Sequence, residues 1–557
     1  MSEKSGGQVL AECLLLNNAT HGFGVPGESY LAVLDALYDI QDRFELMVSR
    51  NEGGAAYMAA AYGALTGKPG LCFVTRGPGA TNAAVGVHSA QQNSTPMILF
   101  VGQVGRDMLG REAFQEIDYS AFFGSVAKWV VQIEDASRIP EIISRAFTVA
   151  TSGRAGPVVV ALPEDVLTEM TSAKPCAARF PALPQARTDT VEQITSLLAG
   201  AERPLILAGG RDWRGASLEA LHNFAESAKL PVVTAFRFND VFDNNSDCYA
   251  GNAGVGMHAE LQQLIRDADV VLALGVRFGE ISTMGYSLFS VPVAKQKIIH
   301  VHVSDDELGK VYVPELSVHA SPGEVVRQLA GVGVSGGWSA SGGWTEKARQ
   351  QFVQSLACPK QPGDVDMGAV SSHLREVLPA DVIVTNGAGN FTAWPNRFLI
   401  YGRDARLLAP QNGTMGFGLP AAIAAKKVQP ERTVVCFAGD GDFQMNCQEL
   451  GSAMQYGALP IVLLVNNGSY GTIRMHQEAN YPDRPSATEI VNPDYVALGK
   501  SYGMHAEVVA KTDDFAAAFE RAMASKTGAI LELKISIESL TPARTLSDIR
   551  DAALNQS

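Results

Sequence analysis

We predict an α/β protein of three domains, each built on a doubly wound parallel sheet, and three observations lead to this fold class. The chain has 557 residues, which exceeds what one hydrophobic core fills and suits about three domains of roughly 150 to 200 residues. Two segments without helical periodicity, the Pro- and Ala-rich residues 171–187 and the Gly- and Ser-rich residues 331–344, divide it into three blocks. In every block, short apolar runs alternate with helical patterns, as buried parallel strands covered by helices require.

The apolar runs place the predicted strands. The clearest are "GLCFVTRG" and "PMILFVGQ" in the first block, "PLILAGG" and "DVVLALG" in the second, and "TVVCFAGD" and "PIVLLVNN" in the third. Ligands of such sheets bind at the carboxyl ends of the strands, so we expect functional residues directly after these runs. The predicted units are an N-terminal domain over 1–170, a central domain over 188–330, a C-terminal domain over 345–540 and a tail over 541–557.

Composition and charge narrow the class of ligand. The formal net charge of −14 disfavours binding to nucleic acid or to an anionic membrane, and favours a small-molecule ligand. No signal-like start and no apolar run of membrane-spanning length is found, so we expect a cytoplasmic location. The seven cysteines are scattered without a CxxC pair and are interpreted as free, mostly buried thiols.

One glycine pattern is interpreted as a decoy. Gly331, Gly333 and Gly336 satisfy the dinucleotide fingerprint GxGxxG, but Ser and Gly follow them instead of an amphipathic helix. We therefore predict a linker here.

Residues 434–474 are the most informative segment and predict a metal-bound diphosphate. They read as strand, Gly-Asp-Gly turn, helix, strand and Asn-Asn turn. Asp440 and Asn467 are 27 positions apart, a length that one crossover fills, so both turns emerge at the same edge of one sheet. Their oxygens and a following main-chain carbonyl suit Mg²⁺ or Ca²⁺, and Gly439 and Gly441 allow phosphates to approach. The alternative is two ordinary turns.

Glu52 stands alone in the small and apolar stretch "SRNEGGAAYMAAAYGAL". A buried carboxylate normally has a partner or a raised pKa, because leaving it ionised and unpaired costs several kcal/mol. From the residues alone, Glu52 is either such a group or an acid that interacts with the dipole at a helix start.

These segments carry a resemblance to a known family. "GDGDF" with the later "VNN" resembles the thiamine diphosphate motif, and the wider set resembles the acetolactate synthase large-subunit branch of the thiamine diphosphate-dependent enzymes. That set consists of "GVPGES", "RNEGGAAYMAAAYGALTGKPG", "GPGATN", "GREAFQE", "GVRF" and "GTMGFGLPAAI". The resemblance covers nearly the whole chain and implies a pyrimidine-binding, a central nucleotide-like and a diphosphate-binding domain.

The resemblance also implies roles for individual residues. Asp440, Asn467 and the carbonyl of Ser469 would hold Mg²⁺, and Met415 would support the bent cofactor. Glu52 would hydrogen-bond the aminopyrimidine and favour the tautomer that removes the thiazolium proton, with the small residues 53–56 as clearance. The other implied contacts to thiamine diphosphate are Asn82, Ala388, Gly389, Asn390, Gly413, Gly439, Gly441, Asp442, Tyr470, Gly471 and Thr472.

The implied reaction is carbon–carbon bond formation or cleavage next to the carbonyl of a 2-oxoacid, aldehyde or 2-hydroxyketone. Phe114 and Gln115 match "AFQE", in which the glutamine lies near the reacting carbon, and this favours a carboligase. The alternatives are a nonoxidative 2-oxoacid decarboxylase, a 2-hydroxyacyl-CoA or oxalyl-CoA type of lyase, and a cofactor-binding homologue without turnover.

Four positions depart from the synthase pattern. Ile281 stands where an arginine binds the substrate carboxylate, His476 where a tryptophan is expected, Arg76 for a serine and Glu28 for a glycine. Glu28 is either a catalytic proton donor or a helix cap, and His476 is a candidate for substrate binding. Arg474 either supplies the missing cation to the substrate or forms a surface salt bridge.

The resemblance further implies that Glu52 and Asp440 serve one cofactor from different subunits, with a homodimer as the minimal active unit and a homotetramer as the assembly. The central segments 251–260 and 301–310 resemble flavin-contacting segments of the synthases, although Ala259 replaces a glycine. FAD, ADP and a vestigial site remain open for this domain.

Overall fold

The computed structural model describes residues 3–332 and 343–555. The predicted linker lies mostly outside these residues, as do Gly333 and Gly336 of the GxGxxG pattern. On either side of it, α11 ends at Val332 and α12 begins at Trp344.

Three six-stranded sheets, all with parallel pairing, confirm the predicted fold class. The N-terminal sheet has the order β3-β2-β4-β5-β7-β6 and consists of β2 (His21–Gly24), β3 (Glu45–Val48), β4 (Gly70–Val74), β5 (Met97–Gln103), β6 (Trp129–Gln132) and β7 (Pro157–Pro163). The central sheet, β11-β10-β9-β12-β13-β14, consists of β9 (Pro204–Ala208), β10 (Val232–Ala235), β11 (Tyr249–Ala253), β12 (Val270–Leu274), β13 (Lys297–His302) and β14 (Leu316–His319). The C-terminal sheet, β16-β15-β17-β18-β20-β19, consists of β15 (Ile383–Asn386), β16 (Arg406–Leu408), β17 (Val434–Gly439), β18 (Ile461–Asn466), β19 (His505–Val509) and β20 (Ala529–Lys534).

Helices cover both faces of the N-terminal and C-terminal sheets. This explains why strands such as β4, β5 and β17 are buried along their whole length. In the N-terminal domain they are α1 (Gly6–Leu16), α2 (Leu31–Tyr38), α3 (Glu52–Thr66), α4 (Gly77–Gln92), α5 (Tyr119–Phe123), α6 (Ile139–Thr151) and α7 (Glu164–Thr168). The C-terminal domain has α13 (Met367–Val377), α14 (Ala393–Phe398), α15 (Gly418–Val428), α16 (Asp440–Gln444), α17 (Leu450–Tyr456), α18 (Gly471–Asn480), α19 (Tyr495–Ser501), α20 (Phe515–Ala524) and α21 (Leu546–Leu554). The central helices are α8 (Thr188–Ala199), α9 (Ala216–Ala228), α10 (Ala259–Asp267), α11 (Pro322–Val332) and α12 (Trp344–Ser355), and β1 (Lys4–Ser5) pairs with β8 (Met170–Thr171) outside the three sheets.

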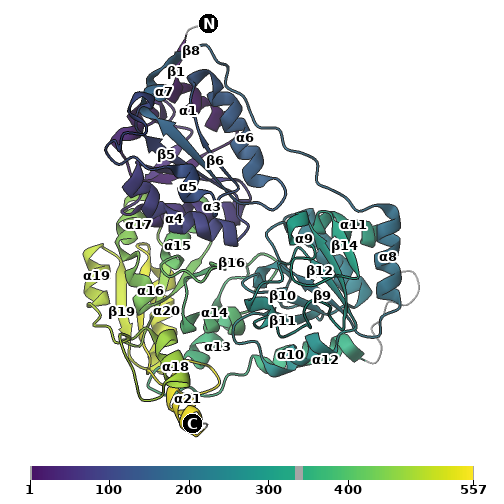
Figure 1. Ribbon diagram of the computed structural model, residues 1–557. Helices are drawn as coiled ribbons and strands as arrows, with labels where there is room; N and C mark the ends of the chain where they lie inside the picture. Colours follow the sequence, from purple (N-terminus) through teal and green to yellow (C-terminus); the bar gives the residue numbers. More distant parts are fainter. Residues whose placement is uncertain (1–2, 333–342, 556–557) are drawn as a thin grey trace.

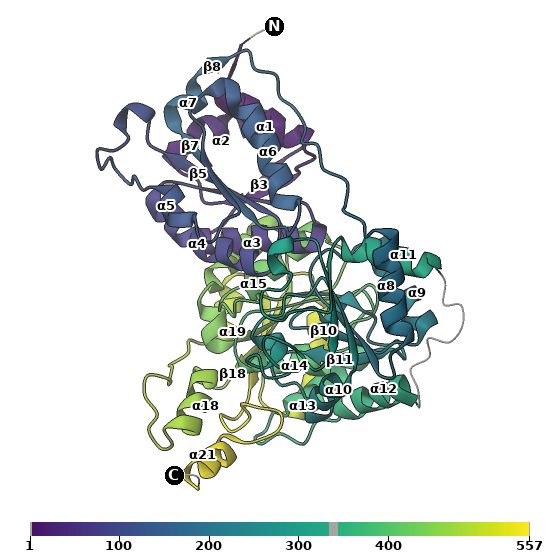
Figure 2. The ribbon, with the colours of Figure 1, turned by 45° about the vertical axis from the view of Figure 1, so that its right-hand side comes forward.

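The N-terminal and C-terminal domains share one hydrophobic core. Side chains of α3 and α4 pack with those of α15, α17 and the C-terminal sheet in a single buried cluster. Figures 1 and 2 both show α3 and α15 side by side between these two domains. The N-terminal end of α3 is therefore held against the C-terminal domain of the same chain.

One domain boundary needs correction. The predicted C-terminal domain begins at residue 345, but α12 packs on the central sheet, where Trp344, Ala348 and Phe352 join the central core. The Trp344 indole N–H donates to the carbonyl of Pro204 at 3.0 Å, and Phe352 meets Tyr249 edge to face at 4.7 Å. An amphipathic helix after a linker fits either neighbouring sheet, so its pattern alone does not decide which one it covers.

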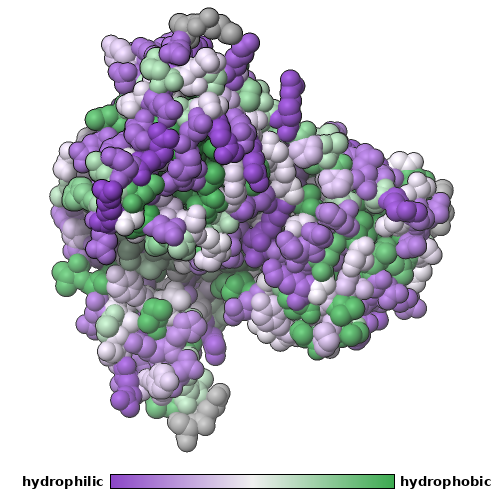
Figure 3. All heavy atoms as spheres, turned by 45° about the horizontal axis from the view of Figure 1, so that its top comes forward, coloured by the Kyte–Doolittle hydropathy of each residue, from purple (hydrophilic) through white to green (hydrophobic). Residues whose placement is uncertain are grey.

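The surface is mixed in character. On the face drawn in Figure 3, hydrophilic residues are spread over all parts of the protein with small apolar areas between them. None of the helices within 3–332 and 343–555 combines the length and apolarity needed to cross a bilayer.

Candidate active site

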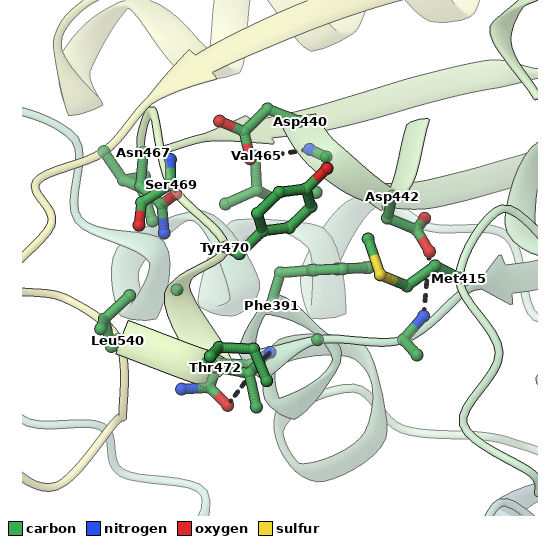
Figure 4. Close-up of a pocket in the computed structure, with 18 of the residues that line it drawn as sticks. Phe391, Met415, Asp440, Asp442, Val465, Asn467, Ser469, Tyr470, Thr472 and Leu540 are labelled. Carbon is green, nitrogen blue, oxygen red and sulfur yellow. Dashed lines mark hydrogen bonds between the residues drawn. The ribbon is translucent and has the colours of Figure 1, made fainter. Parts of the chain in front are cut away.

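A pocket opens at the carboxyl edge of the C-terminal sheet, where loops follow β15, β17 and β18 (Figure 4). All fourteen C-terminal residues predicted to contact the cofactor line it, and so do Phe391 and Leu540. The predicted residues are Ala388, Gly389, Asn390, Gly413, Met415, Gly439, Asp440, Gly441, Asp442, Asn467, Ser469, Tyr470, Gly471 and Thr472. Residues as far apart in the sequence as Ala388 and Leu540, 152 positions, thus converge on one cavity.

Asp440 lies at the centre of the predicted metal site. β17 and β18 pair directly, with Gly439 opposite Val465, so the crossover brings Asp440 close to the Asn467 turn. The Asp440 side chain is buried; its Oδ1 accepts the Gly441 N–H at 3.0 Å and its Oδ2 the Gly468 N–H at 2.8 Å. Burial raises the pKa of this carboxyl. A cation beside it would offset that cost, so the donor set fits Mg²⁺.

Asn492 supports Asp440 and was not identified from the sequence. Its Nδ2 donates to Asp440 Oδ2 at 2.8 Å and to Asn466 Oδ1 at 2.9 Å. Tyr495 Oη lies 3.0 Å from Asn492 Oδ1 and 3.3 Å from the main-chain oxygen of Asp440. Asn492 is 52 positions from Asp440 in an irregular segment, where no spacing rule marks it.

Asp442 joins two loops of the pocket. Its Oδ1 accepts the N–H of Ala388 at 3.0 Å and that of Gly416 at 2.9 Å, and burial raises the pKa of this carboxyl to about 7. A side chain at Gly387 would collide with it, because a Cβ there would lie 1.9 Å from Oδ1. Asp442 therefore organises the loops that carry Ala388 and Met415, whatever contact it makes with a diphosphate.

Glu52 lies at the carboxyl edge of the N-terminal sheet, after β3. It is the first residue of α3, after Asn51, whose Oδ1 accepts the Gly53 N–H at 2.8 Å and caps the helix. Glu52 Oε2 accepts a hydrogen bond from Asn82 Nδ2 at 2.9 Å, which joins two residues predicted to serve the cofactor. Glu52 does not line the pocket of its own chain.

The other predicted residues of the N-terminal domain follow β2 and β5 at the same edge as Glu52, and Glu28 begins the 3₁₀ segment Glu28–Tyr30. Glu28 follows β2 and is exposed, and Phe114 in the loop after β5 is 71% exposed. Gln115 has a positive φ of 66°, and its carbonyl accepts the Gly77 N–H at 2.9 Å. None of the three lines the pocket of the same chain.

Arg474 forms an ion pair within its own helix, and its role as a substrate ligand stays a prediction. Its Nη2 lies 2.9 Å from Oε1 of the buried Glu478, whose other oxygen lies 3.0 Å from Nε of Arg550 in α21. The arrangement favours the salt-bridge alternative, in a more buried setting than a surface pair. His476 is exposed on the same helix, and Ile281 is 39% exposed in the central domain; neither lines the pocket.

Two hollows of the central domain bear on the open question of FAD. A cavity at the carboxyl edge of its sheet is lined by Arg154, Arg211 and Arg277. Arg154 and Arg277 lie 2.9 Å and 3.6 Å from Oε1 of the buried Glu307, and Arg211 lies 3.4 Å from Asp240. The predicted flavin segment around Gly256 lines a different hollow. Each of these arginines thus lies beside a carboxylate of the same chain, and Glu307 is shared by Arg154 and Arg277.

Comparison with known families agrees with this geometry. The N-terminal, central and C-terminal domains of the thiamine pyrophosphate enzymes match residues 4–122, 191–329 and 387–533, and the first and last of these are described as binding thiamine pyrophosphate. The chain belongs to the thiamine pyrophosphate enzyme family. The C-terminal match includes all fourteen predicted pocket residues, and the N-terminal match includes Glu52 and Asn82.

Similar members of the thiamine pyrophosphate enzyme family are acetolactate synthases. The large subunit of Parasynechococcus marenigrum is 32% identical over 90% of this chain and 82% of its own length. The mitochondrial enzyme of Schizosaccharomyces pombe is 30% identical over 96% and 83%, and the isozyme 2 large subunit of Escherichia coli is 30% identical over 96% of both chains. The comparisons confirm the predicted thiamine diphosphate-dependent enzyme of the acetolactate synthase-like carboligase type.

Proposed function

We propose that this thiamine diphosphate enzyme joins two small carbonyl compounds, with a 2-oxoacid as donor and a second 2-oxoacid or an aldehyde as acceptor. The observation that carries the proposal is the pocket in which all fourteen predicted C-terminal residues converge. When bound, thiamine diphosphate supplies the electron sink for making or breaking a carbon–carbon bond beside a carbonyl. The residues of this chain bind and orient the reactants and move protons.

Mg²⁺ and the diphosphate of the cofactor would share the pocket. Asp440, Asn467 and the Ser469 carbonyl would hold the metal, since Mg²⁺ prefers such hard oxygens and takes its remaining ligands from water and phosphate. Support comes from the burial of Asp440 and from the hydrogen bonds that orient it. Gly439 and Gly441 at the end of β17 allow the phosphates to approach the backbone.

A homodimer is the minimal active unit, and a homotetramer is the proposed assembly. Glu52 and the pocket lie at the edges of different sheets, and Glu52 is not among the residues that line the pocket of its own chain. Two copies related by a two-fold axis would bring Glu52 of each subunit to the pocket of the other. The small residue at position 54 makes room for Glu449 of the same chain, because a Cβ there would lie 2.6 Å from Glu449 Oε1.

Residues at the edge near Glu52 select the second reactant. Phe114 offers an exposed apolar ring, and the family resemblance implies that the Gln115 amide would lie near the reacting carbon. Glu28 is an exposed acid at this edge and is the proposed proton donor when no acceptor is captured. This acid is the observation that favours the second candidate function, a nonoxidative decarboxylase or acyl-CoA lyase.

A substrate panel tests the proposal. We expect purified enzyme with Mg²⁺ and thiamine diphosphate to convert pairs of 2-oxoacids and aldehydes to 2-hydroxyketone or 2-hydroxy-2-acyl-acid products, measured by mass spectrometry. Glu28→Gln should raise the ratio of ligated to protonated product. Aldehyde as the sole product from every 2-oxoacid would favour the decarboxylase, and acyl-CoA cleavage the lyase. Trace acetolactate from pyruvate would not suffice.

The central domain is proposed to be vestigial with respect to flavin. We expect the purified protein to show no visible flavin absorbance and to release no flavin on denaturation, because ion pairs within the chain occupy Arg154, Arg211 and Arg277. Stoichiometric flavin in the denatured supernatant would contradict this expectation. Added ADP serves as the comparison ligand, since ADP that raises the melting temperature would indicate a nucleotide site without flavin.

A further inference from the structure

Glu449 is a fully buried carboxylate with no part in the pocket. It ends the short 3₁₀ segment Cys447–Glu449, directly before α17, and its side chain points across to the N-terminal domain. Its Oε1 accepts the N–H groups of Arg50 at 3.0 Å and Asn51 at 2.9 Å, and its Oε2 accepts the Ser452 hydroxyl at 2.6 Å. A buried carboxylate needs such donors, and here two of them belong to the other domain.

These two donors are the residues immediately before Glu52. α3 has 15 residues and begins at Glu52, so the Glu449 carboxylate lies at the positive end of the α3 dipole. Contact with the first turn is tight, because a Cβ at Gly54 would lie 2.6 Å from Glu449 Oε1. A larger residue at position 54 would push Glu449 away from the helix start.

The rest of the turn before α3 is held by α17 as well. Val48 donates its N–H to Tyr456 Oη at 2.8 Å, and its carbonyl oxygen lies 3.2 Å from Ser452 Oγ. Arg50 Nη2 donates to Gln455 Oε1 at 2.8 Å. The segment that links β3 to Glu52 is therefore hydrogen-bonded to the C-terminal domain as well as to its own sheet.

We propose that Glu449 is a positioning residue that fixes the start of α3, and through it the Glu52 side chain, relative to the C-terminal domain. The inference rests on the proposed function for the role of Glu52. Glu449 touches neither the pocket nor Glu52 itself, so it acts through the main chain of Arg50 and Asn51. One carboxylate thereby fixes the start of α3 to the C-terminal domain of the same chain, and in the proposed dimer α3 then presents Glu52 to the pocket of the partner subunit.

The test compares Glu449→Gln and Glu449→Ala with Asp366→Asn. Asp366 is the matched control, since its carboxylate caps α13 in the same domain by accepting the N–H groups of Gly368 and Ala369. The first readout is hydrogen–deuterium exchange of backbone amides without any cofactor. We expect faster exchange of residues 50–54 in both Glu449 variants, with Gln the milder, and unchanged exchange there in Asp366→Asn.

The second readout is the rate at which bound thiamine diphosphate exchanges its thiazolium proton for deuterium at saturating cofactor and Mg²⁺. We expect a fall of roughly 10- to 100-fold in the Glu449 variants, because small misplacements of a catalytic group have effects of this size. The cofactor dissociation constant should change little. Normal proton exchange despite loosened amides would overturn the positioning role, and so would unchanged amides in Glu449→Gln.

The two proposals fail in distinguishable ways. No accelerated thiazolium exchange in the unmodified enzyme would contradict the proposed function, whereas the amide readout still decides whether Glu449 holds the turn. If Glu449→Ala does not fold, the nearly isosteric Glu449→Gln carries both measurements.

Discussion

Replacing Glu52 by Gln is expected to lower the turnover rate by about 10²- to 10⁴-fold while thiamine diphosphate still binds. Gln keeps the size of the side chain and can still accept the hydrogen bond from Asn82. It cannot exchange a proton with the cofactor ring, and general acid–base steps are worth this range of rates. The measurement is the turnover rate on the best substrate of the panel, with cofactor affinity from calorimetry.

Glu45→Gln is the control for this prediction. Glu45 lies at the start of β3, at the opposite end of the strand from Glu52, and pairs with Lys427 at 2.7 Å. Its replacement removes one carboxylate from the same strand–helix unit and should leave the turnover rate unchanged. A Glu52→Gln enzyme with near-normal turnover would show that Glu52 is only a helix-start acid that interacts with the dipole.

Replacing Asp440 by Ala is expected to weaken Mg²⁺-dependent binding of thiamine diphosphate by more than roughly 100-fold. The change removes the one carboxylate of the proposed metal set and leaves the Gly441 and Gly468 N–H groups without their acceptor. Outer-shell partners of a metal ligand typically contribute 10- to 100-fold, so a direct ligand should contribute more. Isothermal titration of the cofactor with and without Mg²⁺ measures the effect.

Asn492→Ala should weaken cofactor binding less than Asp440→Ala does. Asn492 orients Asp440 but supplies no ligand in the proposed set, so a loss of roughly 10-fold is expected. Metal removal by dialysis against a chelator should imitate Asp440→Ala in the unmodified enzyme, and Mg²⁺ should restore binding. Equal cofactor affinity of Asp440→Ala and the unmodified protein in Mg²⁺ would rule out the assigned metal site.

The sequence could predict that Asp440 and Asn467 lie close together, because this geometry depends only on segments that are near each other in the chain. One strand–helix–strand crossover leaves Asp440 and Asn467 at neighbouring strand ends, and the pairing of β17 with β18 is the observed result. The apolar runs likewise predicted the strands, because a strand buried on both faces has no polar alternation. Which residues contact the cofactor remains a prediction that the proposed variants test.

Other features depend on contacts between distant parts of the chain. Glu449 and Arg50 are 399 positions apart, and Arg550 reaches Glu478 over 72 positions. Neither pair leaves a periodicity or spacing in the sequence. The sequence left open whether Arg474 binds a substrate or a carboxylate of the chain, because an acid at i+4 such as Glu478 is common on helix surfaces. The structure shows that Glu478 is buried, which makes it a closer partner for Arg474 than an exposed acid would be.

The amino-acid sequence by itself determined the three α/β domains and the edge at which the metal and diphosphate residues meet, because strand burial and crossover length are set by neighbours along the chain. The tertiary structure decided that α12 covers the central sheet, that Arg474 is paired, and that the turn before Glu52 is held by Glu449. Those outcomes depend on which surfaces meet when the chain folds. In the sequence alone, an amphipathic helix, a cation or a lone carboxylate is compatible with several partners.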